Sequence, residues 1–229
     1  MDLNSEHNTR TDDRSIAISN AIDWLLNYHK EATYDALDAT FFGSLADDDH
    51  HFLQELGDEV IENIMGNAFE WLLADGKITI KDQEYQVAEL LLGGNAPLFS
   101  TEQRQEIEQL SVTPLRLYEI VGIEPGESMV IRDALIPEHP LVHIQNEPRS
   151  QYLVKHDFLA SRVLPAEVHS ELSSVIYSFP RARSLEFIRE LRDGLKGFEP
   201  DSSNAKSIAS VVIPFSWLQL LLNPFELPP

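Results

Sequence analysis

Leu115 to Arg132 reads LRLYEIVGIEPGESMVIR, and this stretch decides the fold class. Leu115, Leu117, Val121 and Ile123 alternate with other residues before Pro125-Gly126, and Met129 and Ile131 resume the alternation after it. Such alternation is typical of strands that bury one face, and Pro-Gly suits the two central positions of a type II turn. The stretch therefore predicts a β-hairpin over 115–132. Glu119 falls on the apolar side of the first strand, which indicates a bulge there or a different strand pairing.

Two further strand-like runs, 141–144 and 158–164, follow the hairpin. Short strands with turns between them, after a helical block, predict a small antiparallel β-sheet or a partly closed barrel.

Helical periodicity dominates the chain before the hairpin. Apolar steps of three and four residues predict helices over 15–29 and 53–75, with looser helical segments over 34–42 and 87–92. Lys77 to Lys81 is expected to be a short strand or an extended connection. Ser100 and Gln103 have the spacing of a capping box, so another helix is expected after Ser100.

The helical period returns after Pro180, and a last helix is expected from 201–204 through Trp217 to Leu221, kinked or interrupted at Pro214. The predicted fold class is therefore α+β, with a helical N-terminal part, a small β-sheet or partly closed barrel, and C-terminal helices. The expected organisation is a disordered terminus (1–13), an acidic helical region (14–112), a small β module (113–170) and C-terminal helices packing on the same body (171–229).

The charge of the chain is strongly negative and unevenly placed. Its 229 residues carry a net charge of −21. Residues 1–75 hold 17 Asp/Glu against 3 Lys/Arg, a balance of −14, and the rest of the chain, with 21 against 14, gives −7. Such a charge repels nucleic acids and anionic lipids and attracts basic proteins. The alternative interpretation is that the excess of acid only keeps the protein soluble.

The sequence also restricts the compartment and the chemistry. There is no cysteine, which excludes disulfides, thiol catalysis and the common structural zinc sites. The first residues lack the basic start and apolar run of a secretory signal. The most apolar stretch, Val211 to Leu222, is interrupted by polar residues and by Pro214, and it is shorter than the about 20 residues that cross a bilayer. These features predict a cytoplasmic protein without membrane contact.

Short motifs between about residues 60 and 200 resemble a group of uncharacterised bacterial proteins, many of which carry a SEC-C metal-binding motif. The motifs are FEWLL (69–73), VAELLL (87–92), LYEI (117–120), PGESMVIRDAL (125–135), RS (149–150) and LASRV (159–163). The resemblance implies a helical lead, a small β module and helices behind it, and it implies no activity. This chain lacks the cysteines of the SEC-C motif, so its metal is not expected here.

Asp47-Asp48-Asp49-His50-His51, with Glu55 further on, is the densest set of metal-ligand types. Neighbouring histidines on a helix point in different directions, and no second site completes a coordination sphere. A solvated helix start explains the run instead, so no metal is expected.

Four residues are candidates for binding. Arg132, Asp133 and Arg162 lie in or beside the predicted strands and could hold an anionic group, although such pairs also serve to fix strand register. Trp217 lies on a helix that is apolar almost all round, which predicts burial within the chain or in a homodimer, or docking on a partner.

No serine-nucleophile elbow, catalytic triad or glycine-rich phosphate loop is present. The sequence therefore favours a non-enzymatic binding or adaptor protein that acts through protein–protein contacts, with no cofactor. Its partner is expected to be a protein. This partner is either a basic protein or a second copy of the chain that associates through the last helix. The alternatives are a small-ligand protein or enzyme with a pocket at the β module, and an acidic mimic of nucleic acid.

Overall fold

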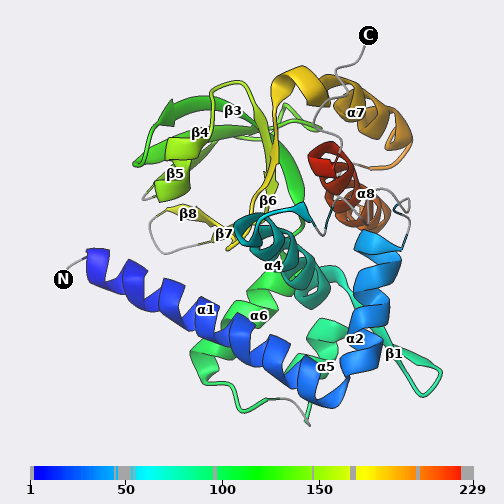
Figure 1. Ribbon diagram of the computed structural model, residues 1–229. Coiled ribbons are helices and arrows are strands. Elements are labelled where there is room, and N and C mark those ends of the chain that lie inside the picture. Colours follow the sequence, from blue (N-terminus) through cyan, green and yellow to red (C-terminus); the bar gives the residue numbers. More distant parts are fainter. Residues whose placement is uncertain are drawn as a thin grey trace. The chain divides into compact units, whose positions relative to one another are not determined.

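A computed structural model describes residues 3–43, 45, 53, 55–94, 97–145, 147–165, 169–199 and 202–222 (Figure 1). In the described part of the chain, helices come first and last and a β-sheet lies between them in sequence, so the fold is α+β as predicted. The chain forms two compact units, each described by itself below. Unit 1 comprises Met1–Leu45 and Ala68–Thr113, and unit 2 comprises Ala46–Asn67 and Pro114–Pro229.

Unit 1 is mainly helical. Its elements are α1 (Leu3–Tyr28), α2 (Lys30–Leu37), the π-helical turn η1 (Asp38–Phe42), the part of α4 (Asp58–Asp75) from Ala68 onward, β1 (Lys77–Ile80), β2 (Gln83–Gln86), α5 (Val87–Leu92) and α6 (Thr101–Val112). The helix expected from residue 15 begins at Leu3, so it includes residues 3–13, which the sequence assigned to the terminus. A helix already nucleated by its packed part can extend through polar residues, because each added residue contributes a hydrogen bond without a new nucleus.

The long helix α1 packs on α6. Its buried residues Ala17, Ala21 and Leu25 recur every four residues and so form one stripe. At one end of this stripe Arg14 Nε donates to Glu106 Oε2 at 2.8 Å, and both side chains are only 7% exposed. Breaking such a buried pair is costly, so the pair holds the two helices in one register.

Local sequence signals determine several boundaries in unit 1. The predicted capping box is confirmed, since Gln103 N–H donates to Ser100 Oγ at 3.2 Å and Gln103 Oε1 accepts from Ser100 N–H at 3.1 Å. Strand β1 is confirmed, but its antiparallel partner β2 was not predicted. The turn between them places Lys81 at φ 50° and Asp82 at φ 63°. A sequence with glycine at neither position gives little sign of such a turn.

Unit 2 contains a curled seven-stranded sheet. Its strands are β3 (Arg116–Glu124), β4 (Ser128–Asp133), β5 (Val142–Gln145), β6 (Phe158–Ser161), β7 (Val163–Pro165), β8 (Ser170–Leu172) and β9 (Tyr177–Phe179), in the order β7-β8-β5-β4-β3-β6-β9. All neighbouring pairs are antiparallel except β5 and β8. Strands β6 and β7 are separated only by Arg162, although they stand far apart in this order. The sheet must therefore curl, like a partly closed barrel, to bring them together.

Both outer strands are short. Strands β7 and β9 have three residues each; Pro165 ends β7 and Pro180 directly follows β9. The predicted β module over 113–170 thus ends at the first residue of β8 and leaves out β9, and the predicted strand 158–164 is divided at Arg162.

The predicted hairpin is confirmed as β3 and β4. Glu127 N–H donates to Glu124 C=O at 3.0 Å, and Gly126 has φ 79°, as a type II turn requires. The register shifts between Ile120 and Gly122, so a bulge lies beside Glu119.

Strand β3 buries side chains on both of its faces. Tyr118 and Ile120 belong to the core cluster, whereas Leu117, which the sequence predicted to be buried, is fully buried on the other face, and Val121 is half-buried there. The core cluster consists of Tyr118, Ile120, Met129, Ile131, Ile144, Leu159 and Leu172. Glu119 points to the other side of the sheet from Tyr118 and Ile120, because side chains alternate along a strand.

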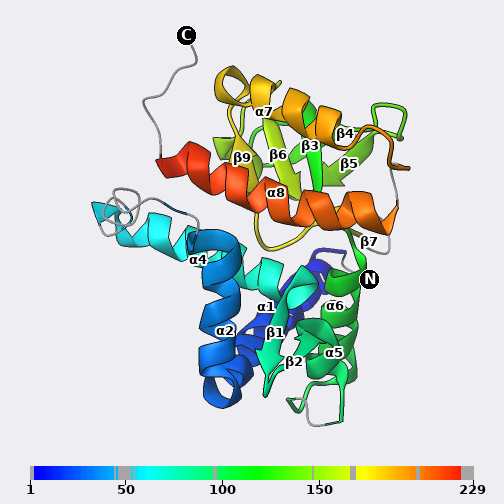
Figure 2. The same cartoon turned by 90° about the vertical axis from the view of Figure 1, so that its right-hand side faces the viewer.

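Unit 2 also contains helices α7 (Arg181–Gly194) and α8 (Ser203–Leu222), the 3-10 turn η2 (Pro148–Tyr152) and the part of α4 up to Asn67. Helix α8 packs against β3 and β9 and lies across the strands in Figure 2. It continues through Pro214, so it is not interrupted there. By length and composition alone α8 is apolar enough to cross a membrane, a test that core helices also pass, and 44% of its most apolar window is buried within the protein.

Candidate ligand pocket

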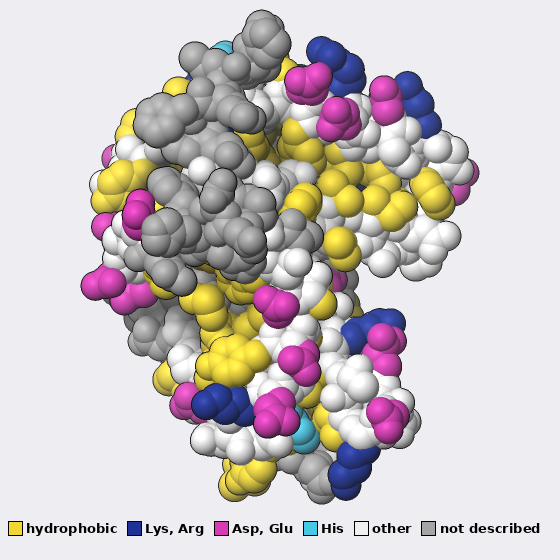
Figure 3. All heavy atoms as spheres, turned by 45° about the vertical axis from the view of Figure 1, so that its right-hand side comes forward, with side chains coloured by type: hydrophobic (Ala, Val, Ile, Leu, Met, Phe, Trp, Pro, Cys, Tyr) yellow, Lys and Arg dark blue, Asp and Glu magenta, His cyan; other side chains and the backbone are white. Residues whose placement is uncertain are grey.

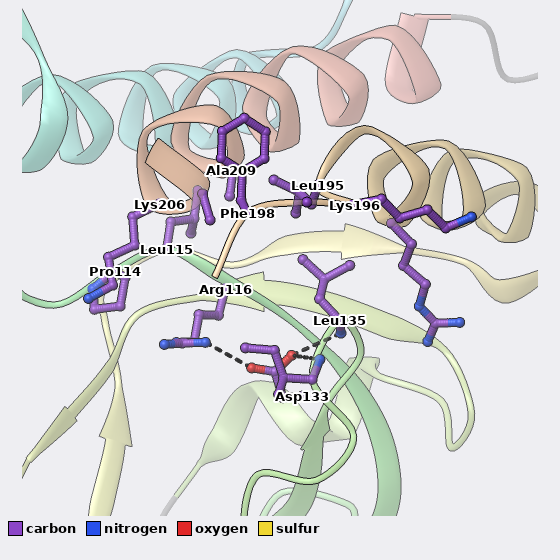
Figure 4. A pocket seen from close by; sticks show the side chains of 14 residues that line it. Pro114, Leu115, Arg116, Asp133, Leu135, Leu195, Lys196, Phe198, Lys206 and Ala209 are labelled. Atoms are coloured by element: carbon purple, nitrogen blue, oxygen red, sulfur yellow. Dashed lines mark hydrogen bonds and ion pairs between the residues drawn. The ribbon is translucent and has the colours of Figure 1, made fainter. Parts of the chain in front are cut away.

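A pocket of about 290 Å³ lies within unit 2, between the sheet and the two C-terminal helices (Figure 4). Three segments far apart in sequence form its walls. They are the start of β3 (114–116), the end of β4 with the turn after it (133–136), and the end of α7 with the beginning of α8 (192–198 and 205–209).

Most of the lining is apolar. The apolar side chains are Pro114, Leu115, Leu135, Ile136, Leu195, Phe198, Ala205 and Ala209. Ala205 and Ala209 are one turn apart on α8, and their small side chains leave the space that larger residues would fill. Gly197, at φ 95°, makes the turn that brings Phe198 over the pocket in Figure 4. Phe198 remains 40% exposed.

Asp133 is the acidic residue of the lining, and its oxygens are already engaged. The residue is 3% exposed. Its Oδ1 accepts from the backbone N–H of Leu135 at 2.9 Å and of Ile136 at 2.8 Å, and its Oδ2 faces Arg116 Nη1 at 3.0 Å and His139 Nδ1 at 3.3 Å. This carboxylate therefore fixes the turn after β4, and its partners leave little capacity for a general base.

Four basic side chains line the pocket, and their partners differ. Arg116 is neutralised by Asp133, and Lys196 pairs with Asp193 at 2.5 Å. Figure 4 shows Lys196 extending away from Arg116 and Asp133. The guanidinium of Arg192 donates to the Ala134 carbonyl, with Nε at 3.0 Å.

Lys206 and Arg192 are the two cations without a carboxylate. Among the described residues neither forms an ion pair. Lys206 is exposed and reaches down beside Pro114 in Figure 4. The polar side chains that the pocket can offer to a ligand are thus positively charged.

The structure does not bring the predicted binding residues together. Asp133 lines the pocket, but Arg132 precedes it on β4 and therefore points to the opposite face. There Arg132 pairs with Glu119 at 2.7 Å across the strands. Arg162 is 1% exposed between β6 and β7, where it is a core residue. Trp217 is 5% exposed and packs edge-on against Tyr177 at 5.3 Å, so within unit 2 it is a core residue as well.

Glu119 is the centre of a separate surface cluster. Arg181 Nη1 lies 3.3 Å and His156 Nδ1 3.6 Å from its Oε1. Burial alone would raise the pKa of the Glu119 carboxyl, but the hydrogen bond and charge of Arg132, together with Arg181 and His156, outweigh burial and hold this pKa below its ordinary value. The cluster joins β3, β4 and the start of α7.

Burial acts in the same direction on Tyr118, and there it outweighs the other influences. It raises the pKa of the Tyr118 hydroxyl far above its ordinary value, and Asp133 raises it further against the influence of Arg116. This phenol is therefore neutral at physiological pH and packs as part of the core.

The described residues contain no group of three or more His, Cys, Asp or Glu side chains that could hold a metal ion. The Asp47–His51 run and the tail 223–229 lie outside the described residues. The four pocket cations, Arg116, Arg192, Lys196 and Lys206, escaped the sequence analysis. A signal for three of them was available, because residues 181–206 hold six Lys/Arg against five Asp/Glu in a chain of net charge −21.

Comparison with protein-family models, with curated proteins and with solved structures gives no match. The resemblance to SEC-C proteins therefore stays a prediction, and the pocket is interpreted from its own residues.

Proposed function

We propose that the protein is a non-enzymatic binding protein that holds a small organic ligand in the pocket of unit 2. The observation that supports this is the pocket itself, an apolar cavity with a few polar groups at fixed positions. Its volume of about 290 Å³ lies just below the range of about 300–1,000 Å³ that is typical of small-molecule sites. A compact ligand suits it best.

The chemistry of the lining favours binding over catalysis. The lining residues that the structure describes include no hydroxyl, thiol or imidazole side chain that could act as a nucleophile or shuttle a proton. The carboxylate of Asp133 is occupied by Arg116 and by two backbone N–H groups. These features support a site that recognises its ligand without transforming it.

The test is a screen of fluorinated fragments against the full chain by ¹⁹F NMR, repeated with Ala209→Trp. The indole would fill the pocket, so the hits are expected to be lost. Ala182→Trp is the matched control, because Ala182 is an exposed alanine on α7 outside the pocket lining. Ala209→Leu makes a smaller change should the indole prevent folding. A screen without hits, or hits that bind Ala209→Trp as well as the wild type, would contradict the proposal.

A second candidate function, contact with a basic protein, has an observation of its own in unit 1. Tyr28 is 71% and Tyr34 47% exposed near the junction of α1 and α2. Asp23, Glu31 and Asp35 are exposed on the same two helices. Exposed aromatic residues among acids are suited to a basic surface with apolar parts.

The assay for this candidate is affinity capture from a lysate at low and high salt, with Tyr28→Ser/Tyr34→Ser beside the wild type. Recovery of a basic protein that falls steeply with salt and is lost in the double variant is expected. A Tyr85→Ser variant changes a tyrosine on β2 and serves as the control. Equal recovery by all three forms would exclude this surface.

A further inference from the structure

The charge of the pocket lining is opposite to that of the whole chain. Among the described residues, four basic and one acidic residue line the pocket, and including Asp193, the partner of Lys196, the balance is four against two. The chain as a whole has a net charge of −21. An anion is repelled by most of such a surface, so a local excess of positive charge at a pocket favours binding there over binding elsewhere.

The distribution of partners shows which cations remain available to a ligand. Arg116 and Lys196 each have a carboxylate. Arg192 donates to a neutral carbonyl, so its charge is not compensated, and Lys206 has no ion pair among the described residues. Arg192 comes from the last turn of α7 and Lys206 from the first turns of α8. They flank the apolar walls and can attract a negative group without giving up an existing ion pair.

The apolar lining determines the rest of the ligand. Leu115, Leu135 and Leu195 offer hydrocarbon contact, and Phe198 covers the pocket from the turn before α8. On the face drawn in Figure 3, hydrophobic side chains also gather over α7 and α8, where Leu185 and Val211 are among the exposed apolar residues. A fully hydrated ion such as inorganic phosphate would leave these walls unused.

We infer that the ligand is a compact amphipathic anion, with a carboxylate or phosphate head and a short apolar body. This rests on the proposed function, since it names the ligand class of the same pocket. The head lies by Lys206, Arg192 adds positive charge on the α7 side of the pocket, and the apolar body contacts the leucines. The two cations select the sign of the charge, and the cavity volume limits the length of the body.

The experiment compares eight-carbon probes on the full chain by saturation-transfer NMR and calorimetry. Octanoate and octyl phosphate carry a negative head, octanamide a neutral one and octylammonium a positive one. Octanoate or octyl phosphate is expected to bind about tenfold or more tightly than octylammonium, and their order identifies the preferred head. Lys206→Glu is expected to weaken binding of the better anion about three- to tenfold, as the loss of an exposed charge pair would.

Controls separate this inference from the proposed function. Lys155→Glu makes the same change of charge at an exposed lysine outside the pocket lining, and it is expected to leave the affinity unchanged. Octanamide or octylammonium could bind as tightly as octanoate and lose this binding in Ala209→Trp. That result would overturn the inference of an anionic head and leave the proposed function standing. If inorganic phosphate displaces octanoate at an equal concentration, the inference that the ligand has an apolar body would be overturned. Anion binding unaffected by both Lys206→Glu and Ala209→Trp would overturn both proposals.

Discussion

The carboxylate of Asp133 is expected to stabilise unit 2 more than any exposed ion pair does, and Asp133→Asn tests this. The amide oxygen can still accept from the N–H groups of Leu135 and Ile136, but the NH₂ group replaces the oxygen that faces Arg116. Breaking a buried ion pair costs about 3–5 kcal/mol. Because the Arg116 side chain is 21% exposed and can regain water, the lower end, about 3 kcal/mol, is expected.

Asp133→Ala is expected to reduce the stability of unit 2 further. Two backbone N–H groups then lose their acceptor, each at about 1–3 kcal/mol, so a total loss of about 5 kcal/mol is expected.

The assay is urea unfolding followed by the fluorescence of Trp217. This residue is the tryptophan of unit 2, and Trp24→Phe with Trp71→Phe removes the signals from unit 1. Asp193→Asn makes the same chemical change in an exposed pair, where the side chains are 75% and 56% exposed, and a change of at most about 0.5 kcal/mol is expected. If Asp133→Asn destabilises unit 2 no more than Asp193→Asn does, the buried network does not contribute as argued.

Three smaller changes probe other parts of the chain. Ser100→Ala removes the N-cap of α6 and is expected to cost about 1 kcal/mol, read from amide hydrogen exchange in that helix; unchanged exchange would contradict it. Thr33→Val replaces a fully buried hydroxyl that has no hydrogen-bond partner among the described residues, and a gain of about 1 kcal/mol in chemical denaturation is expected rather than a loss. Glu119→Gln is expected to cost about 1 kcal/mol at pH 7. Because the folded-state pKa of Glu119 lies below its ordinary value of 4.5, its contribution is complete above pH 4.5 and is lost as the pH falls below it, so wild type and variant should converge in acid; a difference that persists there would refute the assignment.

Local signals allowed the sequence to predict much of the fold. The capping box at Ser100, the turn at Pro125-Gly126 and the periodic helices depend on residues close together in sequence, and the structure has each of them. Strands β8 and β9 were missed because three-residue strands are too short to show periodicity. The predicted helix 53–75 is interrupted at Leu56-Gly57: Leu53 and Glu55 are helical, but α4 begins only at Asp58.

The candidate site was less accessible to sequence analysis. Arg132 and Asp133 were considered together because they are neighbours, but neighbours on a strand point to opposite faces. The actual partner of Asp133 is Arg116, 17 residues earlier. The pocket joins 114–116, 133–136, 192–198 and 205–209, and only the packing of the two helices on the sheet brings these segments together.

The short outer strands of the sheet bear on how unit 2 meets other molecules. An open strand edge is a template on which another chain can add, and long flat edges lead to aggregation. Here each outer strand has three residues, and proline, which has no N–H to donate, closes β7 at Pro165 and follows β9 at Pro180. Little backbone is left at either edge for strand addition. Unit 2 is thus expected to recognise other molecules through side chains and not through strand addition. The same short edges protect its sheet from growing into a fibril.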